Sequence, residues 1–164
     1  MADAQTVREQ LDALAAFPAQ LRALVAGLSD EALRFRPAPG EWSIVENIGH
    51  LIDIDTLQGR RVGQIIARDN PPIEPFDVDE AVRRNGYQDK QASALLNTFA
   101  ERRAALVEEW RYIRPANLER AGIHPVRGPV TIATIIGMVV RNDEAHRAQI
   151  MATLEAYRRA QGQS

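Results

Sequence analysis

Apolar residues recur at helical spacing along most of this chain, and no alternation of apolar and polar residues is long enough to predict a β-strand. The pattern predicts four main helices, which cover about residues 3–28, 43–68 and 88–112 and a final stretch from residue 131. A helix with one apolar face must bury that face against another element. The chain is therefore expected to fold as an all-α, antiparallel four-helix bundle.

The ends of the predicted helices carry local signals. The tetrapeptide Ser43–Glu46 fits a capping box, in which the serine and glutamate side chains each bond to the other residue's backbone amide, so a helix should start at Ser43. Thr131 offers a capping hydroxyl to the last helix. Pro18 removes one backbone hydrogen bond from the first helix, which leaves two alternatives: an interrupted helix, or a short helix to Ala16 followed by a second one.

Two long segments break the helical pattern. Residues 71–86 carry three prolines and an acidic run, which favours an irregular crossover with one turn of helix, long for a bundle loop. Residues 114–129 are again rich in proline and glycine and predict a second irregular connection.

Length and composition limit the classes of function. The 164 residues predict one domain, spanning residues 1–164. The formal net charge is −2 and no basic run occurs, so no nucleic-acid partner is expected. Because the chain has no cysteine, disulfides, thiolate metal ligands and cysteine nucleophiles are excluded, and His, Asp, Glu and Asn are the candidate ligands.

The sequence also carries no signal for membrane insertion or export. The first residues lack the charged and apolar regions of a signal peptide. The longest mostly apolar run, Val130–Val140, is too short to cross a bilayer. We therefore expect a cytoplasmic protein with no membrane partner.

Only three histidines occur, and two of them, His50 and His146, lie in the middle of predicted helices beside apolar residues. Two interpretations stay open. Each can be a core histidine with one hydrogen-bonding partner. Alternatively, side chains from facing helices converge in a bundle core, so the two imidazoles can hold a divalent metal there.

Two stretches of the sequence resemble a known family. Residues Leu33–Ile44 followed by His50–Asp53, and residues Gly128–Ile132 followed by Asp143, His146 and Gln149, look like the second-helix and last-helix signatures of the DinB-like superfamily, which includes the YfiT-like metal-dependent hydrolases. Together the two matches cover most of residues 28–68 and 122–152. The order and separation of the two stretches make the resemblance more specific than either stretch alone.

The resemblance implies a four-helix bundle of up-down-down-up topology, with a long crossover between the second and third helices. It also implies a divalent metal such as zinc, nickel or iron, held by a histidine on the second helix and a His-x-x-x-His pair on the last, and it implies a homodimer. The corresponding positions here are His50, Asn142 and His146. Asn142 departs from the pattern, because an amide oxygen is a weak ligand for zinc or nickel compared with an imidazole.

Carboxylates near these positions are further candidates. Asp53 lies one helical turn beyond His50, where it can orient that imidazole or supply an oxygen ligand. Asp143 and Glu144 are interpreted as charges on the helix surface.

Other polar and aromatic residues have two interpretations each. His124 lies in the connection before the last helix, either solvated or folded over the bundle mouth. Arg61, Arg141 and Arg147 flank the two histidines in sequence, either as solvated charges or as an anchor for a carboxylate substrate. Trp42 is interpreted as a structural anchor at the start of the second helix.

Two classes of function stay open at this point. The first is a metal-dependent hydrolase or thiol-dependent S-transferase, in which the ion activates water or a thiol against a small-molecule substrate. The second is a protein that has kept the bundle without the metal and serves as a small-molecule binder or a dimeric interaction module in a stress response, an alternative that rests on Asn142.

Overall fold

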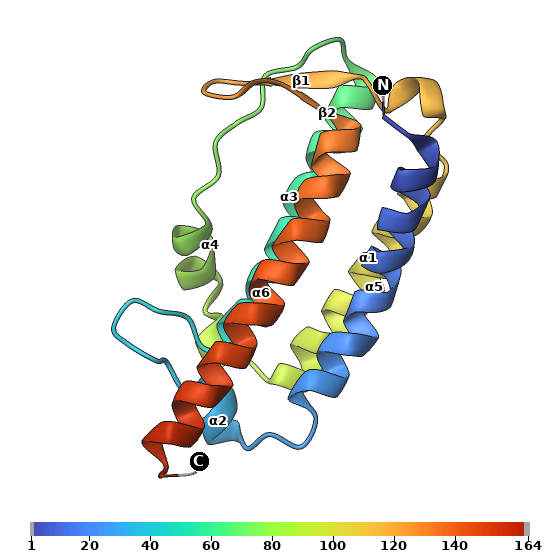
Figure 1. Cartoon of the computed structure of the whole chain (residues 1–164). Helices are drawn as coiled ribbons and strands as arrows, with labels where there is room; N and C mark the ends of the chain where they lie inside the picture. The colour runs from blue at the N-terminus through green and yellow to red at the C-terminus, as the bar shows by residue number, and fades with distance from the viewer. Residues whose placement is uncertain (1, 163–164) are drawn as a thin grey trace.

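Four long helices form the body of the protein in the computed structural model, which describes residues 2–162. They are α1 (Ala4–Val25), α3 (Ile44–Ala67), α5 (Ala92–Arg111) and α6 (Ile132–Ala160) (Figure 1). Shorter elements connect them: the helices α2 (Asp30–Arg34) and α4 (Val78–Asn85), the 3₁₀ turns η1 (Tyr87–Asp89) and η2 (Pro115–Asn117), and the strands β1 (Ala121–His124) and β2 (Gly128–Thr131). The predicted all-α four-helix bundle is confirmed.

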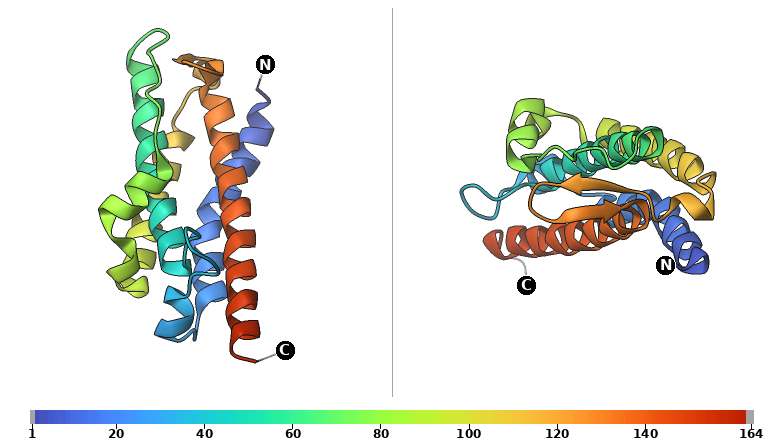
Figure 2. Two further views of the ribbon diagram at one scale, coloured as in Figure 1. Left: turned by 90° about the vertical axis from the view of Figure 1, so that its left-hand side faces the viewer. Right: turned by 90° about the horizontal axis from the view of Figure 1, so that it is seen from above.

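The helices have the up-down-down-up arrangement. Helices α3 and α5 run in the same direction, while α1 and α6 run opposite to both (Figures 1 and 2). The parallel partners pack against each other, and the antiparallel contacts are those of α1 with α5 and of α3 with α6. Parallel neighbours cannot be joined by a short turn, so the chain returns from the end of α3 along the outside of the bundle before α5 begins. This return is the predicted crossover.

The predicted helix starts at Ser43 and Thr131 are confirmed. The Glu46 amide donates to Ser43 Oγ at 3.2 Å, and the Ser43 amide donates to Glu46 Oε1 at 3.1 Å, which completes the capping box. The Thr134 amide donates to Thr131 Oγ1 at 3.0 Å and caps α6. Local chemistry therefore sets where the two helices that carry His50 and His146 begin.

Helix α1 is continuous through Pro18, so the alternative with two separate helices is wrong. A proline at this position has no N–H to donate to the carbonyl of Leu14, one turn earlier. The Arg103 guanidinium supplies the missing donor, because Arg103 Nη1 donates to Leu14 O at 3.1 Å. A side chain from α5 thus satisfies the carbonyl that the proline leaves free, and the helix need not break.

Arg103 also holds the centre of the bundle together. It is 1% exposed and makes paired hydrogen bonds of 2.7–3.0 Å to the carboxylates of Asp55 on α3 and Asp143 on α6. Apolar clusters lie on either side of this group along the bundle, one around Trp110 and one around Phe99. The interpretation of Asp143 as a surface charge is therefore wrong: its helix face points inward, and the guanidinium compensates its burial.

The connections hold more structure than the sequence pattern predicts. The crossover contains α4, two turns rather than one, capped by Asp77, whose side chain accepts from the Glu80 amide at 3.0 Å. Residues 121–131 form an antiparallel hairpin rather than an irregular loop. Strands of four residues are too short for an alternating pattern to be read from sequence.

The crossover covers an apolar side of α3. A Cβ atom on Gly49 would lie 2.1 Å from Tyr87 Cγ, so only glycine lets the tyrosine ring pack directly on the helix backbone. Ile52 and Leu57 are buried within the single chain in the same region. This apolar side therefore needs no second copy of the chain to cover it. Within residues 2–162, no helix is long and apolar enough to span a membrane.

Candidate functional site

The two mid-helix histidines meet between α3 and α6. The ring centroids of His50 and His146 lie 4.3 Å apart, and both rings line an open cavity of about 440 Å³. His50 is 3% exposed, and His146 is half-buried. Residues that are far apart in sequence thus form one imidazole pair at the wall of a cavity.

Trp42 is the third ring of this cluster. Its ring centroid lies 4.8 Å from that of His50 and 5.9 Å from that of His146, on which it stacks at an interplanar angle of 16°. It precedes the capping residue Ser43, so the tight start of α3 places the indole over the imidazoles. Trp42 therefore lines the candidate site as well as anchoring the helix start, a role that the sequence did not indicate.

Asn47 determines which nitrogen of His146 carries the proton. The Asn47 Nδ2 donates to the carbonyl of Ser43 at 2.9 Å, which fixes the orientation of the amide. Its Oδ1 therefore accepts, and it does so from His146 Nδ1–H at 2.8 Å. The neutral ring then has its lone pair on Nε2, the form in which a histidine binds a metal or accepts a proton.

His50 and Asn142 form the second polar contact of the site. His50 Nε2 lies 3.3 Å from Asn142 Oδ1. Two buried atoms of this pair, His50 Nδ1 and Asn142 Nδ2, have no hydrogen-bond partner among the described residues. Buried polar atoms without a partner are costly, so they mark a place where a ligand atom is favourably bound.

Both imidazoles are neutral at pH 7. Burial, with a smaller contribution from the neighbouring His146 ring, lowers the pKa of His50 to about 4, against the opposing effect of the hydrogen bond to Asn142. Burial also lowers the pKa of His146 to about 4. Neutral imidazole is the state that coordinates a divalent ion.

Asp53 makes its hydrogen bonds away from the histidines. Its Oδ1 accepts from the Tyr87 hydroxyl at 2.5 Å and from Asn85 Nδ2 at 3.0 Å. Burial raises the pKa of this carboxyl, against the effect of those two bonds. Asp53 is not hydrogen bonded to His50, and its contacts tie the end of α4 and η1 to α3.

The donor set suits a weak divalent-metal site. His50 and His146 offer two neutral imidazoles, and Asn142 adds an amide oxygen at the third position. No group of three or more His, Cys, Asp or Glu side chains able to hold a metal occurs in the part of the chain that the structure describes. An ion held here would have His50 and His146 as its strong ligands and Asn142 as a weak one.

The remaining candidates separate into two regions. Arg141 lines a hollow with residues of α1, and Arg147 hydrogen bonds to Gln20 of the same helix. His124 and Arg61 instead line a second cavity, beside the one that holds the histidine pair. Of the three arginines that flank the histidines in sequence, Arg61 lines the cavity next to the histidine pair, whereas Arg141 and Arg147 lie beside α1.

The fold and the histidine pair define a four-helix-bundle protein with an imidazole-lined cavity between two helices. The chain belongs to the DinB superfamily, whose family model matches residues 13–150. The resemblance of the two sequence signatures to this family is thereby confirmed.

Individual relatives support the same assignment. A protein of Oceanobacillus iheyensis is 25% identical over 146 residues, 88% of this chain and 83% of its own length. One of Geobacillus thermodenitrificans is 35% identical over 77 residues, 47% of this chain and 43% of its own length. Both are named "Putative metal-dependent hydrolase".

A solved structure shares the fold. YfiT from Bacillus subtilis, described as a probable metal-dependent hydrolase with an unusual four-helix bundle topology, matches with a TM-score of 0.88 at 20% identity. The match covers 100% of this chain and 92% of that chain. At this identity the likeness establishes the fold alone.

Proposed function

We propose that this protein is a metal-dependent hydrolase whose divalent ion is held by His50 and His146, with Asn142 as a weak third ligand. One observation carries the proposal: two buried, neutral imidazoles from facing helices meet at a cavity, and Asn47 leaves the Nε2 lone pair of His146 free. A bound zinc, nickel or iron ion supplies Lewis acidity there and lowers the pKa of a nucleophilic water or thiol. The names of the relatives support the same class of chemistry.

The protein's own residues prepare the site. Asn47 holds the His146 ring in one tautomer and one orientation. The Trp42 ring packs against both imidazoles and forms part of the cavity wall. Asn142 places an amide oxygen 3.3 Å from His50 Nε2 at the wall of the cavity.

A second candidate function is favoured by Asn142. With an amide in place of the third imidazole, the cavity can bind a small molecule through the polar atoms of His50 and Asn142 without any metal. In that case the bundle serves as a binding or interaction module, and the ring cluster provides an apolar wall with two polar contacts.

Metal content separates the two functions. Untagged protein should contain about one ion per chain by elemental analysis, and the His50→Ala variant should lose it. His124→Ala is the matched control, because His124 lies in the other cavity, and it should keep the ion. Metal far below one per chain, with no rise in melting temperature on adding nickel or zinc, would contradict the proposal and leave the metal-free binder.

Reaction class needs a separate assay. With metal-loaded protein, an ester or amide substrate consumed without added thiol identifies a hydrolase. Consumption of an alkyl halide or epoxide only in the presence of a low-molecular-weight thiol identifies an S-transferase instead. In both assays the His50→Ala variant is the blank, since it retains the cavity and loses the ion.

A further inference from the structure

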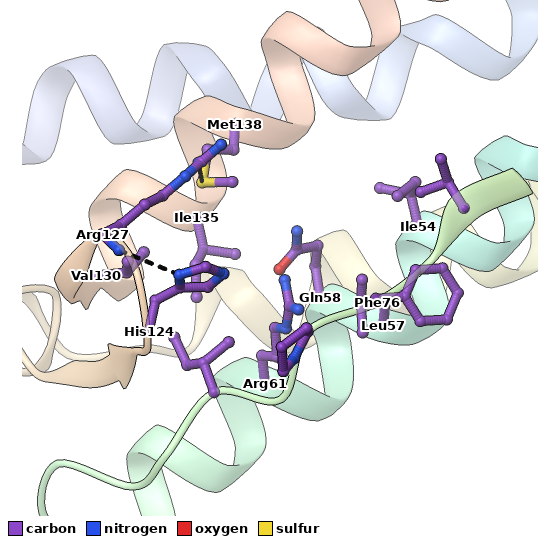
Figure 3. Close-up of a pocket in the computed structure, with 13 residues that line it drawn as sticks. Ile54, Leu57, Gln58, Arg61, Phe76, His124, Arg127, Val130, Ile135 and Met138 are labelled. Atoms are coloured by element: carbon purple, nitrogen blue, oxygen red, sulfur yellow. Dashed lines mark hydrogen bonds between the residues drawn. The ribbon is translucent and has the colours of Figure 1, made fainter.

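A second cavity, of about 330 Å³, lies beside the histidine pair. Its walls come from α3, the extended part of the crossover, the β1–β2 hairpin and the first turns of α6 (Figure 3). Most of the lining is apolar, including Leu57, Phe76 and Ile135, and the polar side chains gather at the hairpin end. The cavity therefore has an apolar body and one polar end.

Two guanidinium groups at the polar end have no carboxylate partner. Arg61 donates to the backbone carbonyl of Glu74 at 2.7 Å, and Arg127 Nη1 lies 4.0 Å from the sulfur of Met138. Neither arginine takes part in any of the ion pairs found within residues 2–162. Burial lowers the pKa of Arg61, and repulsion by the charges of Arg60 and Arg127 adds to the effect. The region thus holds a concentration of positive charge without a counterion from the protein.

His124 adds a directed hydrogen-bond donor. Its Nδ1 accepts from the backbone amides of Val126 at 3.1 Å and Arg127 at 3.2 Å. Two N–H donors on Nδ1 place the proton of the neutral ring on Nε2. Figure 3 shows this ring in the cavity between the side chains of Arg127 and Arg61. The hairpin turn therefore holds the ring so that its N–H can reach a ligand.

Gln58 is the fourth polar group. Its side chain is buried, and its Oε1 has no hydrogen-bond partner among the described residues. Gln58 lies on α3 one turn before Arg61, and both side chains enter the same cavity (Figure 3). Because an amide oxygen only accepts hydrogen bonds, Gln58 Oε1 does not bind an anionic group, and Gln58 forms a polar part of the cavity wall beside Arg61.

From these observations we propose that the second cavity is a binding site for a small organic anion with an apolar body, whose head is held by Arg61, Arg127 and His124. Guanidinium groups form short, charge-assisted pairs with carboxylate and phosphate oxygens, and the imidazole N–H adds a neutral donor. The apolar lining accepts a hydrocarbon chain or ring, which supplies most of the buried surface.

The site leads toward the histidine pair. Ile54 and Val78 line both cavities, and His50, Ile54, Gln58 and Arg61 follow one another along one face of α3. At 1.5 Å per residue, Arg61 lies about 16 Å along the helix from His50. A ligand held by its anionic head at Arg61 extends its body toward the imidazoles. Anion binding itself does not depend on a metal at His50 and His146.

Binding of matched amphiphiles tests the site. Octanoate, octyl phosphate and octanamide each contain eight carbon atoms. The first two have anionic head groups, and octanamide has a neutral one. In protein kept free of metal by EDTA, calorimetry should show that the anions bind at least roughly tenfold more tightly than the amide. The anion with the higher affinity identifies the head group, carboxylate or phosphate. Equal affinity for all three compounds would overturn the proposal.

Substitutions locate the binding. Arg61→Gln should weaken binding of the preferred anion by roughly tenfold and leave octanamide unchanged, while Arg61→Lys, which keeps the charge, should weaken it less. Arg60→Gln is the matched control, since it removes the same charge from an exposed neighbour, and it should change affinity by less than about twofold. Anion affinity that survives Arg61→Gln, in a variant with an unchanged melting temperature, overturns the assignment.

Anion binding and metal binding can be tested separately. His50→Ala should bind the anion as the wild type does, so a protein without metal that still binds octanoate contradicts only the proposed function. A protein that holds metal at His50 but does not distinguish octanoate from octanamide contradicts only the anion site.

Discussion

Nδ1 of His146 on α6 lies 2.8 Å from Oδ1 of Asn47 on α3. One helix thus supplies both His50 and the amide that orients the histidine of the facing helix. The amide is itself held by the carbonyl of Ser43, the residue that caps α3. The chain of contacts from helix cap to amide to imidazole makes the geometry of the site depend on where α3 begins.

Removing this amide tests its role. Asn47→Leu should lower affinity for zinc or nickel about 10- to 100-fold, because the His146 ring loses the acceptor that fixes its tautomer. Isothermal titration calorimetry measures the change. Asn97→Leu, on the exposed face of α5, is the control for replacing an asparagine with leucine and should leave metal affinity unchanged. Equal affinities for the Asn47 and Asn97 variants would show that Asn47 does not support a metal site.

The third ligand position can be restored. Asn142→His should tighten binding of zinc or nickel by well over about tenfold, because it adds an imidazole one turn before His146 on the same helix face. Histidine and asparagine have similar helix propensities, so α6 should tolerate the change. Asn142→Ala serves as the comparison and should bind no more tightly than the wild type. A titration in which the histidine variant gains nothing would show that residue 142 is not a ligand position.

Burial of the imidazoles predicts acid destabilisation. The pKa of each ring is near 4 in the folded state and near 6.5 in the unfolded chain, so the unfolded state binds more protons between those values. Stability from this source is complete above about pH 6.5 and is lost as the pH falls toward 4, by on the order of 3 kcal/mol for His50.

Asp143 acts in the opposite sense over part of this range. Its folded pKa is raised to about 6 by burial, so protonation of this carboxyl adds stability as the pH falls. Urea denaturation between pH 4 and 7, with EDTA present, should show less acid destabilisation in the double variant His50→Gln/His146→Gln. A pH profile that is the same in both proteins would contradict the low imidazole pKa values.

Arg103 should be essential for the stability of the fold at a pH where its partners Asp55 and Asp143 are charged. Arg103→Leu should destabilise the fold by about 3–5 kcal/mol, since it leaves two buried carboxylates without a cation and frees the Leu14 carbonyl. Arg111→Leu breaks the exposed pair with Asp12 and should cost about 1 kcal/mol or less. Chemical denaturation at pH 7 gives both values, and equal losses would refute the structural role of Arg103.

A compensated variant separates charge burial from packing. When Asp55 and Asp143 are also replaced by leucine, much of the stability lost in Arg103→Leu should return, because no buried charge then lacks a partner. A triple variant as unstable as the single one would show that packing around residue 103, rather than charge, sets the cost.

Several features of this protein follow from its sequence because their causes are local. The capping residues Ser43 and Thr131 determine where two helices begin, and the apolar periodicity determines the four long helices. The two family signatures placed His50, Asn142 and His146 at corresponding positions. Each of these inferences needs only residues within a few turns of one another, together with the resemblance to the family.

Tertiary structure alone decided the contacts between segments that are far apart in the chain. The rotation of α6 about its axis turns Asp143 inward to Arg103 and brings His146 to Asn47. The spacing of apolar residues in the sequence does not determine this rotation closely enough to predict either contact. Pro18 stays inside α1 because a guanidinium from α5 reaches the carbonyl that the proline leaves free. The partner in each case lies on another helix, so its identity depends on how the helices pack.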